Sequence, residues 1–85
     1  MAQEFPFRIV TPAGVVFTGA VSRVTLCNAG GSFSVLANHA PLIAGLAAQT
    51  AQWEDGGGIH RFTLSGGVAE VSGQGLTILA PEAAV

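Results

Sequence analysis

The sequence predicts an all-β fold, a flattened sandwich or barrel of two antiparallel sheets with about nine or ten short strands. Short runs rich in β-branched and aromatic residues recur along its 85 residues, and sequences rich in Gly, Pro, Asn or Asp separate them. No segment keeps the period of apolar residues that an amphipathic helix requires. A chain of this length supports one thin hydrophobic core, so residues 1–85 are interpreted as a single domain.

The predicted strands alternate with short turns in chain order. Residues that take turn conformations readily separate them, as in 11–14, 28–31, 55–58 and 73–75. Residues 81–85 are left as a tail without a strand. The runs that we interpret as strands are 5–10, 15–18, 21–27, 32–36, 42–46, 49–54, 59–64, 68–72 and 76–79.

Alternation within these runs assigns side chains to the core or to the surface. Trp53 shares one side of its strand with Ala51, which favours a core position over a surface anchor. Cys27 has no cationic neighbour in sequence that would favour a thiolate, so it is interpreted as a packed, inert thiol. The predicted core comprises Val10, Val24, Leu26, Phe33, Val35, Phe62, Leu64, Val71, Ile78 and Leu79.

The charge content limits the classes of partner. The sequence has 3 Arg and no Lys, a net charge of −2, and only 9% charged residues, so it lacks the basic stripe that nucleic-acid binding requires. With 49% hydrophobic residues, a face covered by a protein partner is expected. The N-terminal sequence does not have the pattern of a secretory signal, and the apolar stretch 40–48 is too short to span a bilayer. We therefore expect no direct membrane insertion.

No motif supports a catalytic, metal or cofactor site. A serine hydrolase could be drawn from Ser34 or Ser65, His39 or His60, and Glu70, but Ser65 lacks the Gly-x-Ser-x-Gly elbow. The His and Cys residues are too scattered to predict a metal centre, and the glycine clusters do not open a helix that could bind phosphate.

The segment 31–42 contains the least ordinary polar residues. Asn38, His39 and Ala40 precede Pro41, which has no N–H for strand pairing and disfavours helix in the residue before it, so a bend is expected here. From the residues alone, His39 is either a core histidine bonded to a backbone carbonyl or a surface residue that presents a ring nitrogen to a partner.

The sequences of 31–42, 62–71 and 76–80 resemble the N-terminal domain of the epsilon subunit of the F-type ATP synthase. The pair His–Ala–Pro and Ser–Gly–Gly–x–x–Glu–Val carries most of this likeness, and residues 10–12 and 16–19 agree with it. The resemblance implies a non-catalytic subunit of the rotating central stalk, peripheral on the cytoplasmic face of the inner (plasma) membrane. Its partners would be the gamma subunit and the c-ring of a proton-translocating enzyme. The alternative is a free-standing β-sandwich that binds another protein or a ligand.

The resemblance also implies two contact surfaces. The residues that match the gamma-facing positions are His39, Pro41, Leu42, Ala44 and Thr11. The residues that match the c-ring-facing loop are Asn28, Ala29, Gly30, Gly31 and Ser32.

The sequence departs from the family pattern at several of these positions. Acidic residues are common in the family's c-ring-facing loop, whereas Gly30 and Ser32 stand here, so no salt bridge to the ring is expected. Ser34 and Ala37 replace the usual Gly and Pro, which is expected to loosen the bend. Family members commonly continue into a pair of C-terminal helices that these 85 residues do not include, so the inhibition and ATP binding of such helices are not carried over from the resemblance.

Overall fold

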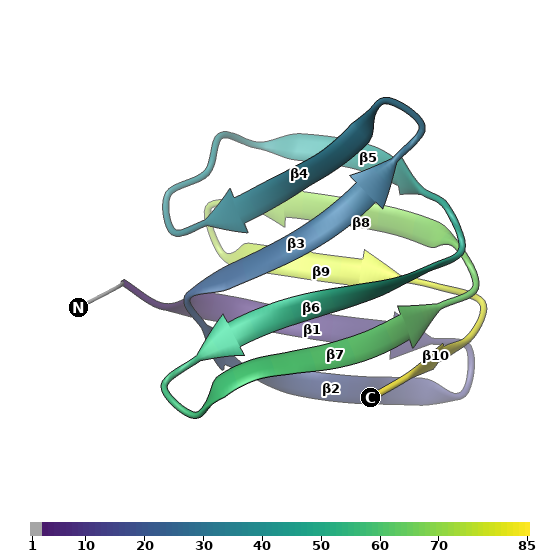
Figure 1. Ribbon diagram of the computed structural model, residues 1–85, viewed down its shortest axis with the longest axis horizontal. Coiled ribbons are helices and arrows are strands. Elements are labelled where there is room, and N and C mark those ends of the chain that lie inside the picture. The colour runs from purple at the N-terminus through teal and green to yellow at the C-terminus, as the bar shows by residue number, and fades with distance from the viewer. Residues whose placement is uncertain (1–2) are drawn as a thin grey trace.

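The computed structural model describes residues 3–85, and Met1 and Ala2, which open the predicted domain, lie outside the described residues. Ten strands form two five-stranded sheets that face each other as a sandwich (Figure 1). The strands are β1 (Phe5–Thr11), β2 (Gly14–Val21), β3 (Arg23–Asn28), β4 (Gly31–Leu36), β5 (Leu42–Leu46), β6 (Gln49–Asp55), β7 (Gly58–Leu64), β8 (Gly67–Ser72), β9 (Gly75–Leu79) and β10 (Ala83–Ala84). The predicted all-β sandwich is confirmed.

The strand orders are β2-β1-β9-β8-β5 in the first sheet and β10-β7-β6-β3-β4 in the second. Each sheet therefore keeps two edge strands, and the sandwich is not a closed barrel. All neighbouring strands pair antiparallel except β1 and β9, which run parallel in the register Phe7↔Leu76 to Val10↔Leu79. The two predicted antiparallel sheets are therefore present with this one parallel exception, where the β1–β2 and β8–β9 hairpins, distant in sequence, meet.

Four of the hairpin turns share one local design. The first residue of each carries a side-chain oxygen, which accepts a hydrogen bond of 2.8 to 3.3 Å from the backbone N–H two residues later. The fourth residue is a Gly with a φ of 113° to 130°, in the positive-φ half of the map that residues with a side chain avoid. The four turns are 11–14, 28–31, 55–58 and 72–75.

Two glycines also allow neighbouring strands to approach closely. A Cβ atom at Gly75 would overlap the carbonyl oxygen of Pro6 in β1, and one at Gly67 would overlap that of Leu79 in β9. Both glycines have positive φ as well. Within the Ser–Gly–Gly sequence of 65–67, Gly67 is therefore required by the packing of the first sheet.

Aromatic rings fill the space between the sheets. The ring centroid of Phe7 lies 5.6 Å from that of Phe17 and 5.8 Å from that of Phe62, and Phe17 lies 4.3 Å from Trp53. Each such ring, when buried, contributes on the order of 1.5–3 kcal/mol to stability. The predicted core residues that are buried are Val24, Leu26, Val35, Phe62, Leu64, Val71 and Ile78, and Trp53 is buried with them.

Of the other predicted core positions, Leu79 is wrong, whereas Val10 and Phe33 are partly buried. Leu79 is 52% exposed, because Ile78 before it points inward and adjacent residues of a strand face opposite sides. Val10 is the register partner of Leu79 and is only partly buried on the same outer side. Phe33 is partly buried against the core. Cys27 is exposed, because its neighbour Leu26 takes the inward position.

The residues predicted as a tail include a short strand. Ala83 and Ala84 of β10 pair with Leu64 and Thr63 of β7. Ser65 stabilises this edge, since its hydroxyl accepts a hydrogen bond from the Glu82 N–H at 2.9 Å and its own N–H donates to the Glu82 carbonyl at 3.0 Å. Residues 3–85 form no helix that is long and apolar enough to cross a membrane.

Candidate interaction surfaces

The bend at 37–41 joins an edge strand of one sheet to an edge strand of the other. β4 ends the second sheet and β5 ends the first, and both lie along the same side of the sandwich (Figure 1). Edge strands leave one row of backbone N–H and C=O groups without a partner strand. The bend therefore lies where a protein partner can reach both sheets at once.

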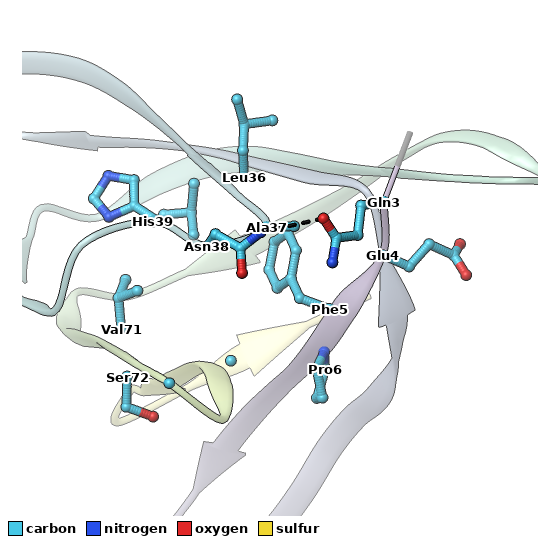
Figure 2. Close-up of a pocket in the computed structure, with 13 residues that line it drawn as sticks. Gln3, Glu4, Phe5, Pro6, Leu36, Ala37, Asn38, His39, Val71 and Ser72 are labelled. Carbon is cyan, nitrogen blue, oxygen red and sulfur yellow. Dashed lines mark hydrogen bonds between the residues drawn. The ribbon is translucent and has the colours of Figure 1, made fainter. Parts of the chain in front are cut away.

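Asn38 gives the bend its shape. It has a φ of 63°, and it is the one residue other than Gly with positive φ among residues 3–85. Asn tolerates this conformation better than most residues. The His39 N–H donates to the Leu36 carbonyl at 3.2 Å. The Asn38 side-chain Nδ2 donates to Gln3 Oε1 at 3.2 Å (Figure 2). A local turn and a contact from the N-terminal segment thus hold the bend together.

His39 lies at the surface and is half-buried, so the core alternative is wrong in location. As expected for a core histidine, the His39 ring is hydrogen-bonded to a backbone carbonyl, because its Nδ1 lies 2.7 Å from the carbonyl oxygen of Ala40. Pro41 beside it is exposed. The ring is therefore both fixed and accessible.

A pocket of about 220 Å³ adjoins the bend (Figure 2). Its lining includes the buried side chains of Phe5, Val35 and Val71 from three different strands. Polar residues at its edge are Gln3, Glu4, Asn38, His39 and Ser72. None of its lining residues is Lys or Arg.

The predicted gamma-facing residues of β5 do not all point outward. Ala44 is buried between the sheets and Leu42 is 36% exposed, whereas Ile43 between them is 72% exposed. A partner on the outer face would contact Ile43, which sequence reasoning missed. No local pattern could have identified it, because residues 42–46 are all apolar or Gly and only the phase of the strand places Ala44 and Leu46 inward.

Thr11 lies far from His39. It ends β1, whereas Phe5 and Pro6 at the start of that strand line the pocket beside His39, and a seven-residue strand spans about 20 Å. The Thr11 hydroxyl belongs to its own turn, where it accepts a hydrogen bond from Ala13 N–H at 3.3 Å. The structure therefore does not bring Thr11 into one patch with the other gamma-facing candidates.

An apolar row, which the sequence did not reveal, crosses the outer face of the first sheet close to Thr11. Its members are register partners on neighbouring strands, and they are partly or largely exposed. They are Val68, Leu79, Val10 and Val15.

The predicted c-ring-facing residues form the exposed hairpin end between β3 and β4. Asn28 Oδ1 accepts a hydrogen bond from Gly30 N–H at 2.8 Å, and Gly31 has a φ of 125°. The structure brings all five predicted residues, 28–32, together at this end. Residues 28–32 include no charged side chain, so the polar contacts of this end come from its backbone, hydroxyl and amide groups.

Gln49 connects this hairpin to the rest of the second sheet. The pairing of β3 with β6 ends at Thr25↔Gln52. Beyond that point the Gln49 side chain, and not the β6 backbone, makes the hydrogen bonds to the backbone of β3. Its Oε1 accepts from Cys27 N–H at 2.7 Å, and its Nε2 donates to the Cys27 carbonyl at 2.8 Å and to that of Ala47 at 2.9 Å. Sequence reasoning missed this residue, since no local pattern reports that two strands diverge.

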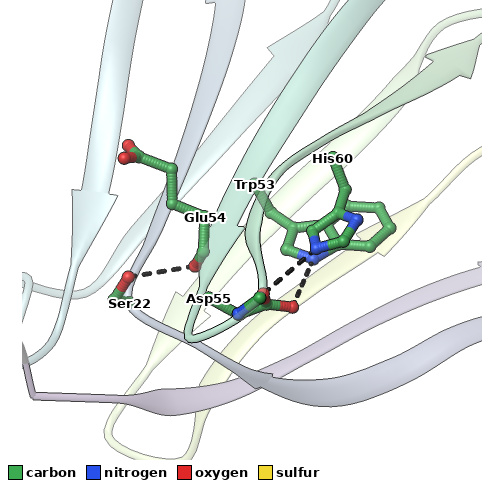
Figure 3. Close-up of polar contacts among 6 residues, drawn as sticks. Ser22, Trp53, Glu54, Asp55 and His60 are labelled. Atoms are coloured by element: carbon green, nitrogen blue, oxygen red, sulfur yellow. Dashed lines mark hydrogen bonds and ion pairs between the residues drawn. The ribbon is translucent and has the colours of Figure 1, made fainter.

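A second polar cluster closes the hairpin between β6 and β7 (Figure 3). Asp55 accepts hydrogen bonds from Gly57 N–H at 2.8 Å, from Trp53 Nε1 at 3.1 Å and from His60 Nε2 at 3.1 Å. The pKa of Asp55 lies below its ordinary value. The hydrogen bond from Gly57 N–H is the largest cause, and the contacts with Trp53 and His60 lower the pKa further. The imidazole of His60 stacks on Trp53 with centroids 5.1 Å apart.

The groups that could have formed a hydrolase are paired elsewhere. Ser65 is bonded to the backbone of Glu82, His60 to Asp55, and His39 to the Ala40 carbonyl. The Ser34 hydroxyl lies 3.4 Å from that of Thr25. No group of three or more potential metal ligands occurs in the described part of the chain.

Comparisons with known proteins place the fold and the sequence in one family. The family model described as "ATP synthase, Delta/Epsilon chain, beta-sandwich domain" matches residues 4–85. A protein named ATP synthase epsilon chain from Rhodopseudomonas palustris (strain BisB5) is 42% identical over 76 residues, which is 89% of this chain and 56% of that protein. One of the same name from Hyphomonas neptunium is 42% identical over 84 residues, 98% of this chain and 62% of that protein. This chain thus spans a little over half the length of these relatives.

Solved structures of ATP synthases contain chains with a similar fold. A chain in the Euglena gracilis mitochondrial ATP synthase, in an assembly of OSCP, F1 and c-ring, superposes with a TM-score of 0.86 at 25% identity over 94% of this chain and 52% of that chain. A chain in the central stalk and c-ring of the Tetrahymena thermophila mitochondrial ATP synthase gives a TM-score of 0.79 at 14% identity, over 96% of this chain and 66% of that chain, which supports the fold alone. Because the family model covers nearly the whole sequence, this chain belongs to the β-sandwich domain family of the ATP synthase delta and epsilon chains.

Proposed function

We propose that this chain is the β-sandwich part of a non-catalytic central-stalk subunit in a proton-translocating F-type ATP synthase, and that it couples the gamma subunit to the c-ring. The match of residues 4–85 to the family model, together with relatives named ATP synthase epsilon chain, carries this proposal. Such a subunit is peripheral to the membrane, on the cytoplasmic face, because the rest of the complex anchors it.

The geometry supports a division of the two contacts between two surfaces. The gamma-facing surface comprises the bend at 37–41 with Leu42 and Ile43, where two sheet edges and exposed apolar side chains lie together. Thr11 is a separate gamma contact at the other end of the first sheet. The c-ring-facing surface is the uncharged hairpin end at 28–32. Two stiff sheets between these surfaces can transmit torque with little internal deformation.

Co-purification tests the proposal. A tagged form of this chain should retain the gamma subunit and the catalytic subunits from its own source at physiological salt. If neither is retained, the stalk assignment is lost and a free-standing binding module is the better description. A second experiment, with purified gamma subunit and purified c-ring added separately, should give binding to each.

Matched variants separate the two surfaces. Ile43→Asp places an unpaired charge on the gamma-facing surface and should weaken binding to gamma by at least about tenfold, while binding to the c-ring is unchanged. Ile59→Asp is the control, since Ile59 is exposed at 59% on the distant β7 and should leave both affinities as they are. Equal effects of the two variants on gamma binding would contradict the assignment of this surface.

A further inference from the structure

The hydrogen bond from the His39 ring determines which of its nitrogens carries the proton. Nδ1 lies 2.7 Å from the Ala40 carbonyl oxygen, and a carbonyl oxygen can only accept. Nδ1 must therefore be the donor and carry the hydrogen. In a neutral imidazole the other nitrogen, Nε2, then has a free lone pair and is a hydrogen-bond acceptor.

The bend holds this acceptor in place. The turn bond from His39 N–H to the Leu36 carbonyl and the bond from Asn38 to Gln3 fix the backbone on which the ring stands. Within residues 3–85, Nε2 has no hydrogen-bond partner, and the residue is only half-buried. A partner can therefore reach a nitrogen whose direction is already set, which lowers the entropy cost of binding.

The surroundings favour a donor on the partner. The lining of the adjoining pocket contains no Lys or Arg that could serve a partner's acceptor, while Phe5 and Val71 form an apolar part of its wall. A carboxylate or carbonyl oxygen of the partner would face the unpaired lone pair at Nε2, which is unfavourable because both groups can only accept. An N–H group of the partner would donate to this lone pair.

We propose that His39 is a specificity-determining residue of the interface with gamma: its Nε2 accepts a hydrogen bond from an N–H group of the gamma subunit. The bond between Nδ1 and the Ala40 carbonyl fixes the tautomer that makes this possible. The inference rests on the proposed stalk function for the identity of the partner, but the tautomer is a property of this chain alone.

The tautomer can be tested without gamma. Nitrogen-15 NMR of the imidazole ring in the free protein at pH 8 should show a protonated Nδ1 and an unprotonated Nε2 for His39. His60 is the internal control with the opposite tautomer, because its Nε2 donates to the Asp55 carboxylate. A protonated Nε2 on His39 would overturn the inference whatever the protein binds.

The acceptor role is tested by three variants at this position. The amide of Gln reaches the position of Nε2, whereas the shorter amide of Asn reaches only that of Nδ1. We expect His39→Gln to bind purified gamma within about threefold of the wild-type affinity, and His39→Asn and His39→Ala to lose about tenfold, the worth of one hydrogen bond.

The possible outcomes are distinct. Equal affinities of the Gln and Asn variants, or wild-type affinity of the Ala variant, would overturn the acceptor role while the stalk function stands. Failure of the wild-type protein to bind gamma would instead overturn the proposed function and this interface with it. Thermal midpoints of all three variants within a few degrees of the wild type exclude unfolding as the cause.

Discussion

The hairpin end at 28–31 and the bend at 37–41 connect strands in different ways. The first uses a side-chain oxygen at its first position and a Gly at its fourth, and the same arrangement recurs in three other turns. The second has no Gly, places Asn38 at positive φ, and depends on a contact with Gln3, which is 35 residues away in sequence. A repeated design serves the fold, whereas a connection built only once is the better candidate for a specific contact.

The repeated turn design predicts the largest effect. Gly75→Ala should destabilise the protein by about 3 kcal/mol or more, because a Cβ atom there would overlap the Pro6 carbonyl oxygen and the φ of 120° disfavours Ala as well. Chemical denaturation followed by Trp53 fluorescence measures the free energy of unfolding. Gly73→Ala in the same turn is the control, since a Cβ atom there meets open space and its change should be small.

Substitutions of Asn38 in the bend at 37–41 should have a smaller effect on stability, and one of them should keep the wild-type properties. Asn38→Ala should cost about 1–2 kcal/mol, because Ala avoids positive φ, and it should weaken gamma binding by displacing His39. Asn38→Gly keeps the backbone conformation and should restore most of both properties. If Gly and Ala are equally damaging, the bond to Gln3 and not the backbone conformation determines the shape of the bend.

The hydrogen bonds between Gln49 and Cys27 predict a local loss of stability at the c-ring-facing surface, residues 28–32. Gln49→Leu removes the three hydrogen bonds of the side-chain amide and should cost about 1 kcal/mol, because solvent can partly replace them at this exposed site. Amide hydrogen exchange at 27–32 should accelerate, and affinity for the c-ring should fall while affinity for gamma does not. Unchanged exchange there would show that the turn design alone holds the hairpin end.

The turn at 55–58 predicts a weak dependence on pH. The pKa of Asp55 is lowered in the folded protein, chiefly by the Gly57 N–H, so its contribution to stability is present above the ordinary value of 3.8 and is lost as the pH falls through and below that value. Asp55→Asn should therefore lower the thermal midpoint at pH 7 and have little effect at pH 2. A loss of equal size at pH 7 and at pH 2 would contradict a role for the charge of Asp55.

Local patterns in the sequence were sufficient for most strands and for the four turns. They identified the inward residues where one apolar side chain alternated with polar ones, as around Phe62. They did not suffice where two apolar residues were adjacent, as at Ile78 and Leu79, because only the phase of the strand decides which one is buried. Cys27 beside Leu26 is the same case.

Features that depend on distant segments could not be predicted. Strand β10 contains only two alanines and exists because Ser65 and Glu82 are bonded beside it. Residues 37–41 were predicted as a bend, but local patterns left His39 open between the core and the surface, and the tautomer of His39 depends on the direction of one carbonyl group. Gln49 was missed because its role arises where β3 and β6 separate.

The parallel pairing of β1 with β9 has a consequence for how the chain folds. Residues 7–10 must find residues 76–79, so the centre of the first sheet closes over a loop of more than sixty residues, which is among the slowest kinds of contact to form. The β3–β4 and β6–β7 hairpins of the second sheet need only neighbouring residues. During synthesis on the ribosome, β3, β4, β6 and β7 of the second sheet can therefore pair first. The hairpin of β1 and β2 gains its third strand only when β9 has been synthesised. Mutations at the β1–β9 contact should slow folding more than those within either hairpin.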